Sequence, residues 1–551
     1  MNVRQALIFL AFSALISSGC THSLETGDAG YNAVSLALSL KNTGAVPEVQ
    51  TKMTAVITQD KDSGYGFRGI EQVYVIPFQT ASAVPVNAGD TRLGGKNVYI
   101  NNPTLGQNDL VANNNSHLYN MASAPHNTNR VLAYGKAFDT GSVSTKEGKH
   151  RNGVLTPSRL NNSNDAGDIS FSLESVLKTD ELTAINQTTD NLIAALNGVV
   201  EVLQATEDTD IKAFLDAFTV ENQISACSYQ SMYRLEQSIL LALHDYNGTN
   251  SVAINAVMAK VSALQAARNA AGSGFPSIYG IPEGAVGMWW NGHRFVRLIT
   301  GVNISLVPMG GYCYPPSLWY YANSSVKTST KDDVKDEYKP QNTTWSSILS
   351  HYTEGTSVQS STRSVAIVDQ LEYGVGLVEF RFAPTGNAVG AVGCPLTGII
   401  IGDQKDVDFS FAPKSAADSR FVYDNNISGV TLGGTSQYVQ ILVLPTADDQ
   451  TVHFALEFQN NTSSSFECQQ GTVQPGCRFY LAGELEPRTG HPEGISGVFD
   501  SDYKTTVYVR VSNLGNAYNT VPDLRDPQLE LGVVAEMDWM QVEPGGIKLP
   551  F

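Results

Sequence analysis

Apolar and polar residues alternate one by one along most of this chain. In 504–511 (KTTVYVRV) and 452–458 (VHFALEF), apolar side chains recur at every second position. Runs of the same kind are 70–78, 130–138, 169–176, 438–445 and 479–487. A period of two residues, broken by turns rich in Gly, Asn, Asp and Pro, predicts short β-strands. Many such strands in succession predict β-sandwich domains.

One region departs from this alternation. From about 179 to 271 the apolar residues fall at steps of three and four, which predicts helices. The first stripe comprises Leu182, Ile185, Leu192, Leu196, Val199 and Leu203. Further helices are predicted near 210–218, 228–246 and 251–270. We expect their apolar stripes to bury against a sheet or against each other. The predicted fold class is therefore mostly β, with a helical insertion in an N-terminal β-sandwich domain.

The segment 31–40 (YNAVSLALSL) has the strictest alternation in the chain. Its branched apolar residues are Val34, Leu36, Leu38 and Leu40, and the residues between them are Ala or Ser. Burying such side chains stabilises a fold by roughly 1.5–3 kcal/mol each. We therefore expect one face of this strand to be buried in the N-terminal domain.

A polar loop with Gly and Pro follows this strand and ends at Lys52, directly before Met53. Exposed loops of this composition are preferred sites of proteolysis. Cleavage after Lys52 by a trypsin-like protease would release the strand 31–40 and leave a hydrophobic groove. The alternative is an ordinary first strand and an uncut chain.

The last residues alternate in the same way. Apolar residues on one side of the pattern include Leu529, Leu531, Val533, Met537 and Trp539, and later Ile547, Leu549 and Phe551. A segment of this kind can add a strand to a neighbouring molecule by β-augmentation. We predict a donor segment over about 529–551; the alternative is that it closes its own domain.

The N-terminus resembles an export signal. Arg4 precedes a short apolar run at 6–16, and Cys20 follows Ser-Ser-Gly. The run is shorter than the roughly 20 residues that a membrane-spanning helix needs. We interpret 1–19 as a signal peptide and Cys20 as the lipidated first residue of the exported chain. Residues 20–52 would then be a lipidated prosegment that contains the strand 31–40.

The net charge bears on the possible partners of this chain, and two of its cysteines bear on a possible disulfide. The net charge of −18 argues against nucleic acid as a partner, since nucleic acid selects basic surfaces. Cys468 and Cys477 flank a predicted hairpin turn, QQGTVQPG, and could form a disulfide in an oxidising compartment.

No pattern in the chain indicates catalysis. The histidines are scattered, and neither HExxH nor GxSxG occurs. We therefore predict a protein without enzymatic activity, cofactor or metal. Trp289, Trp290, Trp319, Tyr320 and Tyr321 are either a sugar-binding platform or, as we favour, core aromatics beside the strands.

Several longer segments together resemble the fimbrillins of Bacteroidales, the subunits of type V pili. They are TKMTAVITQ (51–59), FRGIEQVYVIPF (67–78), FPSIYGIPEGAVGMWW (275–290), YPPSLWYYANSSVKTS (314–329), SVAIVDQLEYGVGLVEFRF (364–382), CPLTGIIIGDQKDV (394–407), FVYDNNI (421–427) and VFDSDYKTTVYVRVSNLGNAYNTVPDLRDPQLELGV (498–533). Each is a structural signature rather than a catalytic one.

The resemblance implies two transthyretin-like β-sandwich domains, over 53–377 and 378–551. It implies a lipoprotein at the cell outer membrane, which a protease trims and which then polymerises into a surface fimbrium by donor-strand exchange. Its partners would be other copies of itself and related fimbrial subunits. Lys52 departs from the Arg that often precedes the cut, so an uncut anchor subunit is one alternative. A monomeric glycan-binding lipoprotein that uses exposed aromatic residues is another.

Overall fold

The computed structural model has a mostly β fold with a helical insertion, which confirms the predicted fold class. It describes residues 31–39, 72–80, 85–93, 98–100, 116–125, 130–137, 144–145, 148–149, 153–298, 311–329, 364–367, 372–382, 393–414, 420–433, 437–448, 450, 451–487, 497–501, 503–511, 514–526, 529–542 and 548–549. The division into two domains near 377 stays a prediction.

One large sheet contains the strands of the N-terminal part of the chain. Its members are β1 (Tyr31–Ser39), β2 (Gln72–Phe78), β3 (Val98–Ile100), β4 (Ser116–Pro125), β5 (Arg130–Lys136), β14 (Trp319–Ser329), β15 (Ser364–Ile367) and β16 (Glu372–Tyr373). The order is β3-β2-β5-β14-β15-β1-β4, and β16 pairs with β14. Strands far apart in sequence are thus neighbours in this sheet.

Two five-stranded sheets form a sandwich from the C-terminal part. The first consists of β13 (Tyr312–Cys313), β20 (Arg420–Asp424), β18 (Leu396–Gln404), β22 (Val452–Gln459) and β25 (Arg478–Leu485), in that order. The second consists of β21 (Gln437–Val443), β17 (Gly376–Phe382), β26 (Tyr503–Val511), β27 (Val533–Val542) and β28 (Lys548–Leu549). Phe380 and Phe454 pack between them with ring centroids 5.2 Å apart.

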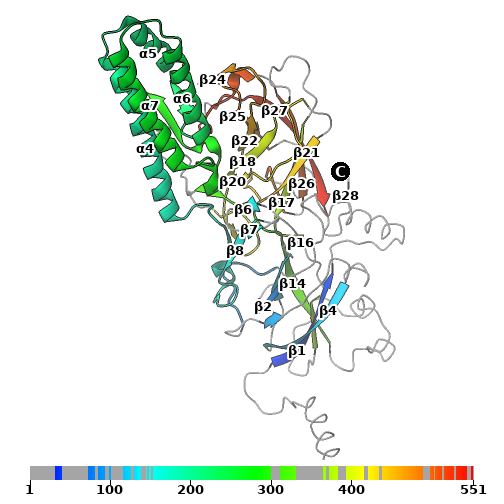
Figure 1. Cartoon of the computed structure of the whole chain (residues 1–551). Coiled ribbons are helices and arrows are strands. Elements are labelled where there is room, and N and C mark those ends of the chain that lie inside the picture. Colours follow the sequence, from blue (N-terminus) through cyan, green and yellow to red (C-terminus); the bar gives the residue numbers. More distant parts are fainter. Residues whose placement is uncertain are drawn as a thin grey trace, which may run out of the picture.

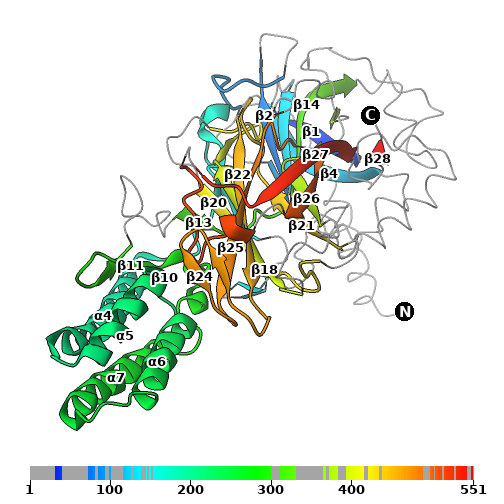
Figure 2. The same cartoon turned by 90° about the horizontal axis from the view of Figure 1, so that it is seen from above.

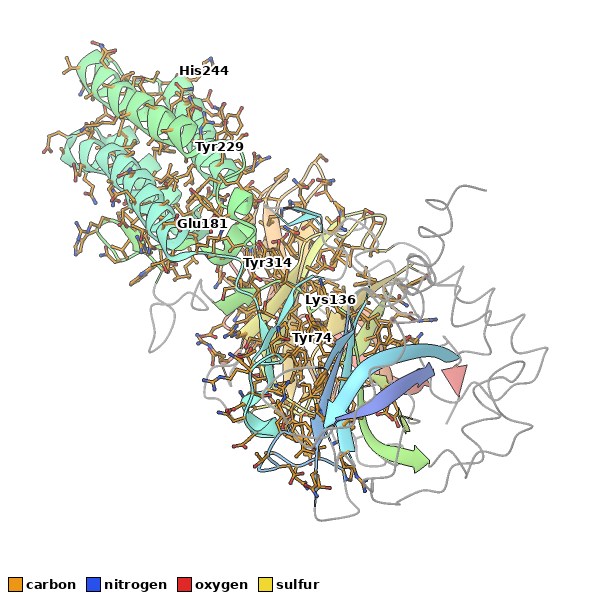
Figure 3. The ribbon with its side chains drawn as sticks, turned by 90° about the horizontal axis from the view of Figure 1, so that it is seen from below. Tyr74, Lys136, Glu181, Tyr229, His244 and Tyr314 are labelled. Atoms are coloured by element: carbon orange, nitrogen blue, oxygen red, sulfur yellow. The ribbon has the colours of Figure 1, made fainter. Side chains whose placement is uncertain are left out.

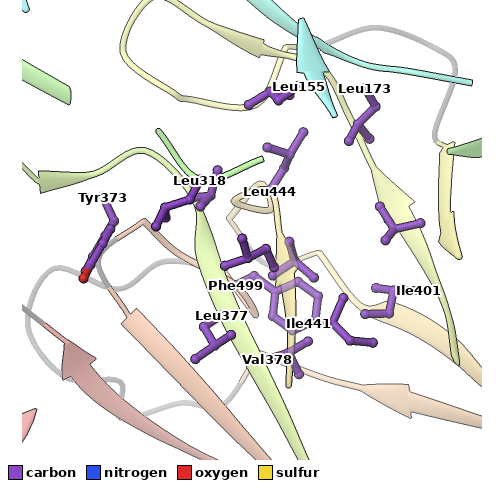
Figure 4. Close-up of a cluster of buried hydrophobic side chains, with 14 of the residues drawn as sticks. Leu155, Leu173, Leu318, Tyr373, Leu377, Val378, Ile401, Ile441, Leu444 and Phe499 are labelled. Atoms are coloured by element: carbon purple, nitrogen blue, oxygen red, sulfur yellow. The ribbon is translucent and has the colours of Figure 1, made fainter. Parts of the chain in front are cut away.

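Shorter elements complete the described chain. They are β6 (Ser144–Thr145), β7 (Gly148–Lys149), β8 (Leu155–Ser158), β9 (Ser170–Leu173), β19 (Val407–Asp408), β23 (Phe466–Cys468), β24 (Gly471–Val473), and the 3₁₀ turns Ala166–Asp168, Ser277–Tyr279, Glu283–Ala285 and Leu514–Asn516. Phe171 of β9 pairs with Val407 of β19 and stacks on Phe411 with ring centroids 4.4 Å apart. Figure 4 shows Leu155, Leu173 and Leu318 in one apolar cluster with residues beyond 377. The main core therefore continues across the predicted domain boundary.

The helical module stands to one side of the β body (Figures 1 and 2). Its helices are α4 (Thr179–Ala205), α5 (Thr209–Glu221), α6 (Tyr229–His244) and α7 (Ser251–Ala271). A small sheet of β10 (Ile224–Ala226), β11 (Gly287–Trp290) and β12 (Phe295–Arg297) lies at its base. The module begins and ends at the predicted residues, 179 and 271.

The module packs on the C-terminal sandwich. Its core contains Leu196 of α4 and Leu264 of α7, and the same cluster includes Ile400, Phe421 and Ala455 from β18, β20 and β22. Figure 3 shows Tyr314 where the module meets the β body, and Tyr229 and His244 along α6. The helices were predicted as an insertion in the N-terminal domain, and in the structure their apolar faces are buried against strands that come later in the chain.

Helix α7 begins at a side-chain cap that we expect to affect stability measurably. The side chain of Asn250 accepts a hydrogen bond from the amide of Ala253 at 3.0 Å. Replacing Asn250 with alanine should lower the free energy of unfolding by about 1 kcal/mol, as loss of an N-cap usually does. Urea denaturation would measure the change. Asn250→Asp, which keeps the acceptor, should stay close to the parent chain, and equal loss in both variants would contradict the capping role.

Candidate functional site

The strand β1 lies inside the N-terminal sheet. It runs parallel to β15, with Val34 opposite Val365, and antiparallel to β4, with Val34 opposite Met121. Leu36 stands opposite Ile367 on one side and Tyr119 on the other. Paired residues of neighbouring strands share a face of a sheet. By backbone register, the apolar side of β1 therefore continues an apolar row across three strands.

Removal of β1 would leave two open edges facing each other. Among the described strands, β4 is hydrogen-bonded to the sheet only through β1. Neighbouring strands are about 4.8 Å apart, so β15 and β4 would face each other across roughly twice that distance. A strand that fills this slot must run parallel to β15 and antiparallel to β4. It must also carry apolar residues at alternate positions, because a shift by one residue would turn them to the other face.

The predicted processing sites lie outside the described residues. Cys20, Leu40, Lys52 and Met53 are among them. The structure therefore places Val34, Leu36 and Leu38 within β1, while lipidation and cleavage stay predictions.

Most of the predicted donor segment belongs to the C-terminal sandwich's own sheet. The strand β27 pairs with β26 from Val533 to Gln541, and Trp539 stands opposite Thr505. Val533 and Met537 are buried in the main core, and Leu529 packs against the core of the helical module. Leu531 is partly buried. This is the arrangement of a segment that closes its own domain, the alternative left open by the sequence.

The end of the chain has a weaker attachment. The strand β28 comprises only Lys548 and Leu549, which pair with Val542 and Gln541 of β27. It is the last strand in the order of its sheet. Ile547 and Phe551 lie outside the described residues. A two-residue edge strand detaches with far less loss of hydrogen bonding than β27 would.

The predicted disulfide is absent, because Cys468 and Cys477 are both free thiols. The hairpin is tighter than the sequence suggested: Cys468 of β23 pairs with Gly471 of β24, so Cys477 lies beyond the hairpin. Burial raises the pKa of each thiol to about 11. Both thiols are therefore protonated and weakly nucleophilic at neutral pH.

The aromatic residues considered as a sugar platform are mostly core residues. Trp319 and Tyr320 are fully buried, and Trp290 packs on Phe295 with ring centroids 5.2 Å apart. Tyr321 is partly buried and lies 5.8 Å from the ring of Tyr134. Trp289 is partly exposed. These residues do not form a shared exposed surface.

A buried polar network joins the helical module to the sandwich, and nothing in the sequence pattern indicates it. The buried carboxylate of Glu457 accepts a hydrogen bond from Tyr480 Oη at 2.8 Å. Arg478 Nε donates to Glu283 Oε2 at 3.2 Å, and Arg478 Nη1 lies 3.9 Å from Glu457 Oε1. Ser228 Oγ donates to Glu283 Oε1 at 2.7 Å. One guanidinium thus serves two carboxylates at this junction.

Burial dominates the electrostatics of this network. It raises the pKa of Glu283 above its usual value, although Ser228 and Arg478 act in the opposite direction. Burial also raises the pKa of Tyr480 well above its usual value. These residues therefore join two parts of the fold.

Other features bear on the class of protein. None of the helices in the described ranges is long and apolar enough to span a bilayer. Within the same ranges, no group of three or more His, Cys, Asp or Glu side chains is arranged to hold a metal ion.

Comparison with family models and with curated proteins finds no match for this chain. Among solved structures, the chain is similar to a "putative cell adhesion protein" from Bacteroides eggerthii, with 8% identity, 94% of this chain and 97% of that chain covered, and a TM-score of 0.34. Two structures described in the same words come from Parabacteroides distasonis. One has 8% identity, coverage of 92% and 97%, and a TM-score of 0.29. The other has 8% identity, coverage of 93% and 100%, and a TM-score of 0.25. At TM-scores this low, neither the fold nor the function of this chain is inferred from these likenesses.

Proposed function

We propose that this chain is a structural and adhesive subunit of a surface fimbrium, which is trimmed by a protease and polymerises by exchange of β1. The observation that carries the proposal is the position of β1 between β15 and β4. The resemblance of the sequence to fimbrillins supports the same function. The role is structural, without catalysis.

Assembly would follow from the sheet order. Cleavage after Lys52 frees β1 from the covalent chain, and its departure opens the slot between β15 and β4. A segment of a second copy then enters as a new inner strand, which is β-augmentation on two edges at once. The segment 547–551 is the best candidate donor, because it alternates apolar residues and its described residues, Lys548 and Leu549, form a short edge strand.

Location and partners follow from the same proposal. Before cleavage, lipid on Cys20 would hold the chain at the cell outer membrane. After cleavage, the partners would be other copies of this chain and related subunits in an extracellular fimbrium. The net charge of −18 argues against nucleic acid as a further partner.

Limited trypsin digestion of the purified full chain under native conditions tests the proposal. We expect a new N-terminus at Met53 and, after incubation, ladders that resist SDS. The double variant Lys41→Ala/Lys52→Ala, which lacks both lysines between the strand and Met53, should retain its N-terminal strand and stay monomeric. A chain ending at Val542 should be cut at the same bond and form no ladder. Cleavage of the parent chain at Lys52 that yields only monomers would refute strand exchange.

One observation favours a second candidate, a non-polymerising anchor subunit or a monomeric binding lipoprotein. The long apolar segment near the C-terminus is fully engaged as β27 in its own sheet, which leaves only a short donor. A resistant monomer that retains residues 21–52 after digestion would support this candidate instead.

A further inference from the structure

Three exposed side chains form a row across the outer face of the second C-terminal sheet. In register, Arg381 of β17 stands opposite Tyr438 of β21 and Tyr508 of β26. Tyr438 is 55% exposed, Tyr508 is 45% exposed, and the side chain of Arg381 is 46% exposed. We refer to these three residues as the Tyr–Arg–Tyr row. Figure 1 shows the three strands that carry it.

A buried cluster beside the row, on the same face and at neighbouring register positions, holds the guanidinium in place. Arg381 Nε donates to Glu379 Oε1 at 2.6 Å, and Lys504 Nζ lies 3.3 Å from Glu379 Oε2. Gln440 Nε2 also donates to Glu379 Oε2. Burial alone would raise the pKa of Glu379, but Gln440, Lys504 and Arg381 together hold it below its usual value. Two cations thus contact one carboxylate, and of these two Arg381 is the exposed one.

Burying the charged residues that hold Arg381 in place lowers stability, which an ordinary surface side chain does not require. Glu379 and Lys504 are almost completely buried, and burying two charges costs stability unless their geometry is well satisfied. The side-chain oxygen of Gln440 is buried and has no hydrogen-bond partner. Binding sites are built in this way, with an exposed recognition group fixed by polar residues below it. The cluster thus fixes one exposed cation between two exposed rings.

We propose that the Tyr–Arg–Tyr row binds a saccharide that carries a carboxylate. The guanidinium retains N–H donors on its two Nη atoms, and these match the two oxygens of a carboxylate. The faces of Tyr438 and Tyr508 lie about two strand spacings apart, roughly 10 Å, and suit the apolar faces of sugar rings.

Arg381 is the exposed cation of the row, so the ligand's carboxylate belongs on Arg381 and its neutral ring on Tyr438 or Tyr508. This inference supplies a ligand class for the adhesive part of the proposed function, and it does not depend on strand exchange.

Binding to the uncleaved, monomeric full chain tests this proposal separately from assembly. Titration calorimetry or saturation-transfer NMR would compare sialyllactose and trigalacturonate with neutral lactose. We expect at least one carboxylated saccharide to bind ten-fold or more tightly than lactose. Arg381→Gln should abolish that preference, and Tyr438→Ala or Tyr508→Ala should weaken binding several-fold. Arg525→Gln removes an arginine that also pairs with an acid, Asp523, and should leave binding unchanged.

Specific outcomes would overturn the ligand assignment. Equal binding of lactose and the acidic saccharides, or no binding of either acidic saccharide, would do so. Retained preference in a folded Arg381→Gln variant would exclude Arg381 as the carboxylate partner. If Arg381→Gln instead changes self-association in light scattering and leaves saccharide binding unchanged, the row is a protein interface and the proposal is wrong.

Discussion

Replacing Arg478 with methionine is expected to lower the free energy of unfolding by about 3–5 kcal/mol, the usual loss when one partner of a buried ion pair is removed. Its guanidinium lies between Glu283 and Glu457, with distances of 3.2 and 3.9 Å. Without it, two carboxylates would remain close together in a region from which water is largely excluded. Since this network joins the helical module to the sandwich, the helical module of the variant should also unfold before the rest of the chain.

The loss should grow as the pH rises. Burial already raises the folded-state pKa of Glu283 above its usual value of 4.5, and Arg478 opposes that shift. Methionine at 478 would therefore raise the pKa further. A carboxyl with a raised folded-state pKa binds its proton more tightly in the folded chain than in the unfolded chain. Its contribution to stability is complete below the unfolded-state pKa and is lost as the pH rises above it.

Urea denaturation at pH 5 and pH 7.5 would measure both effects. The larger difference between variant and parent is expected at pH 7.5. Arg525→Met is the matched control, because Arg525 pairs with Asp523 near the surface. Partly exposed pairs of this kind contribute about 0–1 kcal/mol. Equal losses in the two variants, or a larger loss at pH 5, would mean that Arg478 does not compensate buried carboxylates.

The sequence predicts the local elements well because their signals are local. The change from two-residue to three- and four-residue spacing marks the helical module from 179 to 271. In the structure, α4 begins at Thr179 and α7 ends at Ala271. The alternation in 31–40 likewise predicts β1. Each of these patterns depends only on neighbouring residues and on which face of an element is buried.

Pairing between distant segments leaves no such signal. Residues of β1 pair with Ser364–Ile367, more than three hundred positions later, and many alternating segments would serve as well. The junction network unites Ser228, Glu283, Glu457 and Arg478, each of which is an ordinary polar residue in its own segment. The same holds for the Tyr–Arg–Tyr row, which exists only because three strands align in one register.

The cysteines illustrate a different limit. Their spacing suggested two strands joined by a long turn, yet β23 and β24 close after Cys468 and leave Cys477 outside the hairpin. A turn of two residues and a turn of eight are both compatible with Gln, Gly and Pro in this segment. The turn residues alone therefore do not decide between the two lengths.

A peptide corresponding to residues 30–41 should restore stability to a chain that spans only 53–542. This chain lacks both β1 and the segment 547–551, so its slot has no occupant from its own sequence. The peptide should pair with β15 and β4 as β1 does. Binding to the folded chain stabilises it by about 2.7 kcal/mol at a peptide concentration one hundred times the dissociation constant.

Thermal unfolding at increasing peptide concentration would measure this rise in melting temperature. The matched control is a peptide of identical composition in which each of Val34, Leu36 and Leu38 is exchanged with the residue after it. That exchange moves the apolar side chains to the opposite face of the strand, and it should remove most of the stabilisation. A second peptide would contain residues 547–551 and be extended to the same length. If it also stabilises the chain, the segment 547–551 is the donor. If the native and exchanged peptides act equally, or neither acts, β1 is an ordinary strand and strand exchange loses its structural basis.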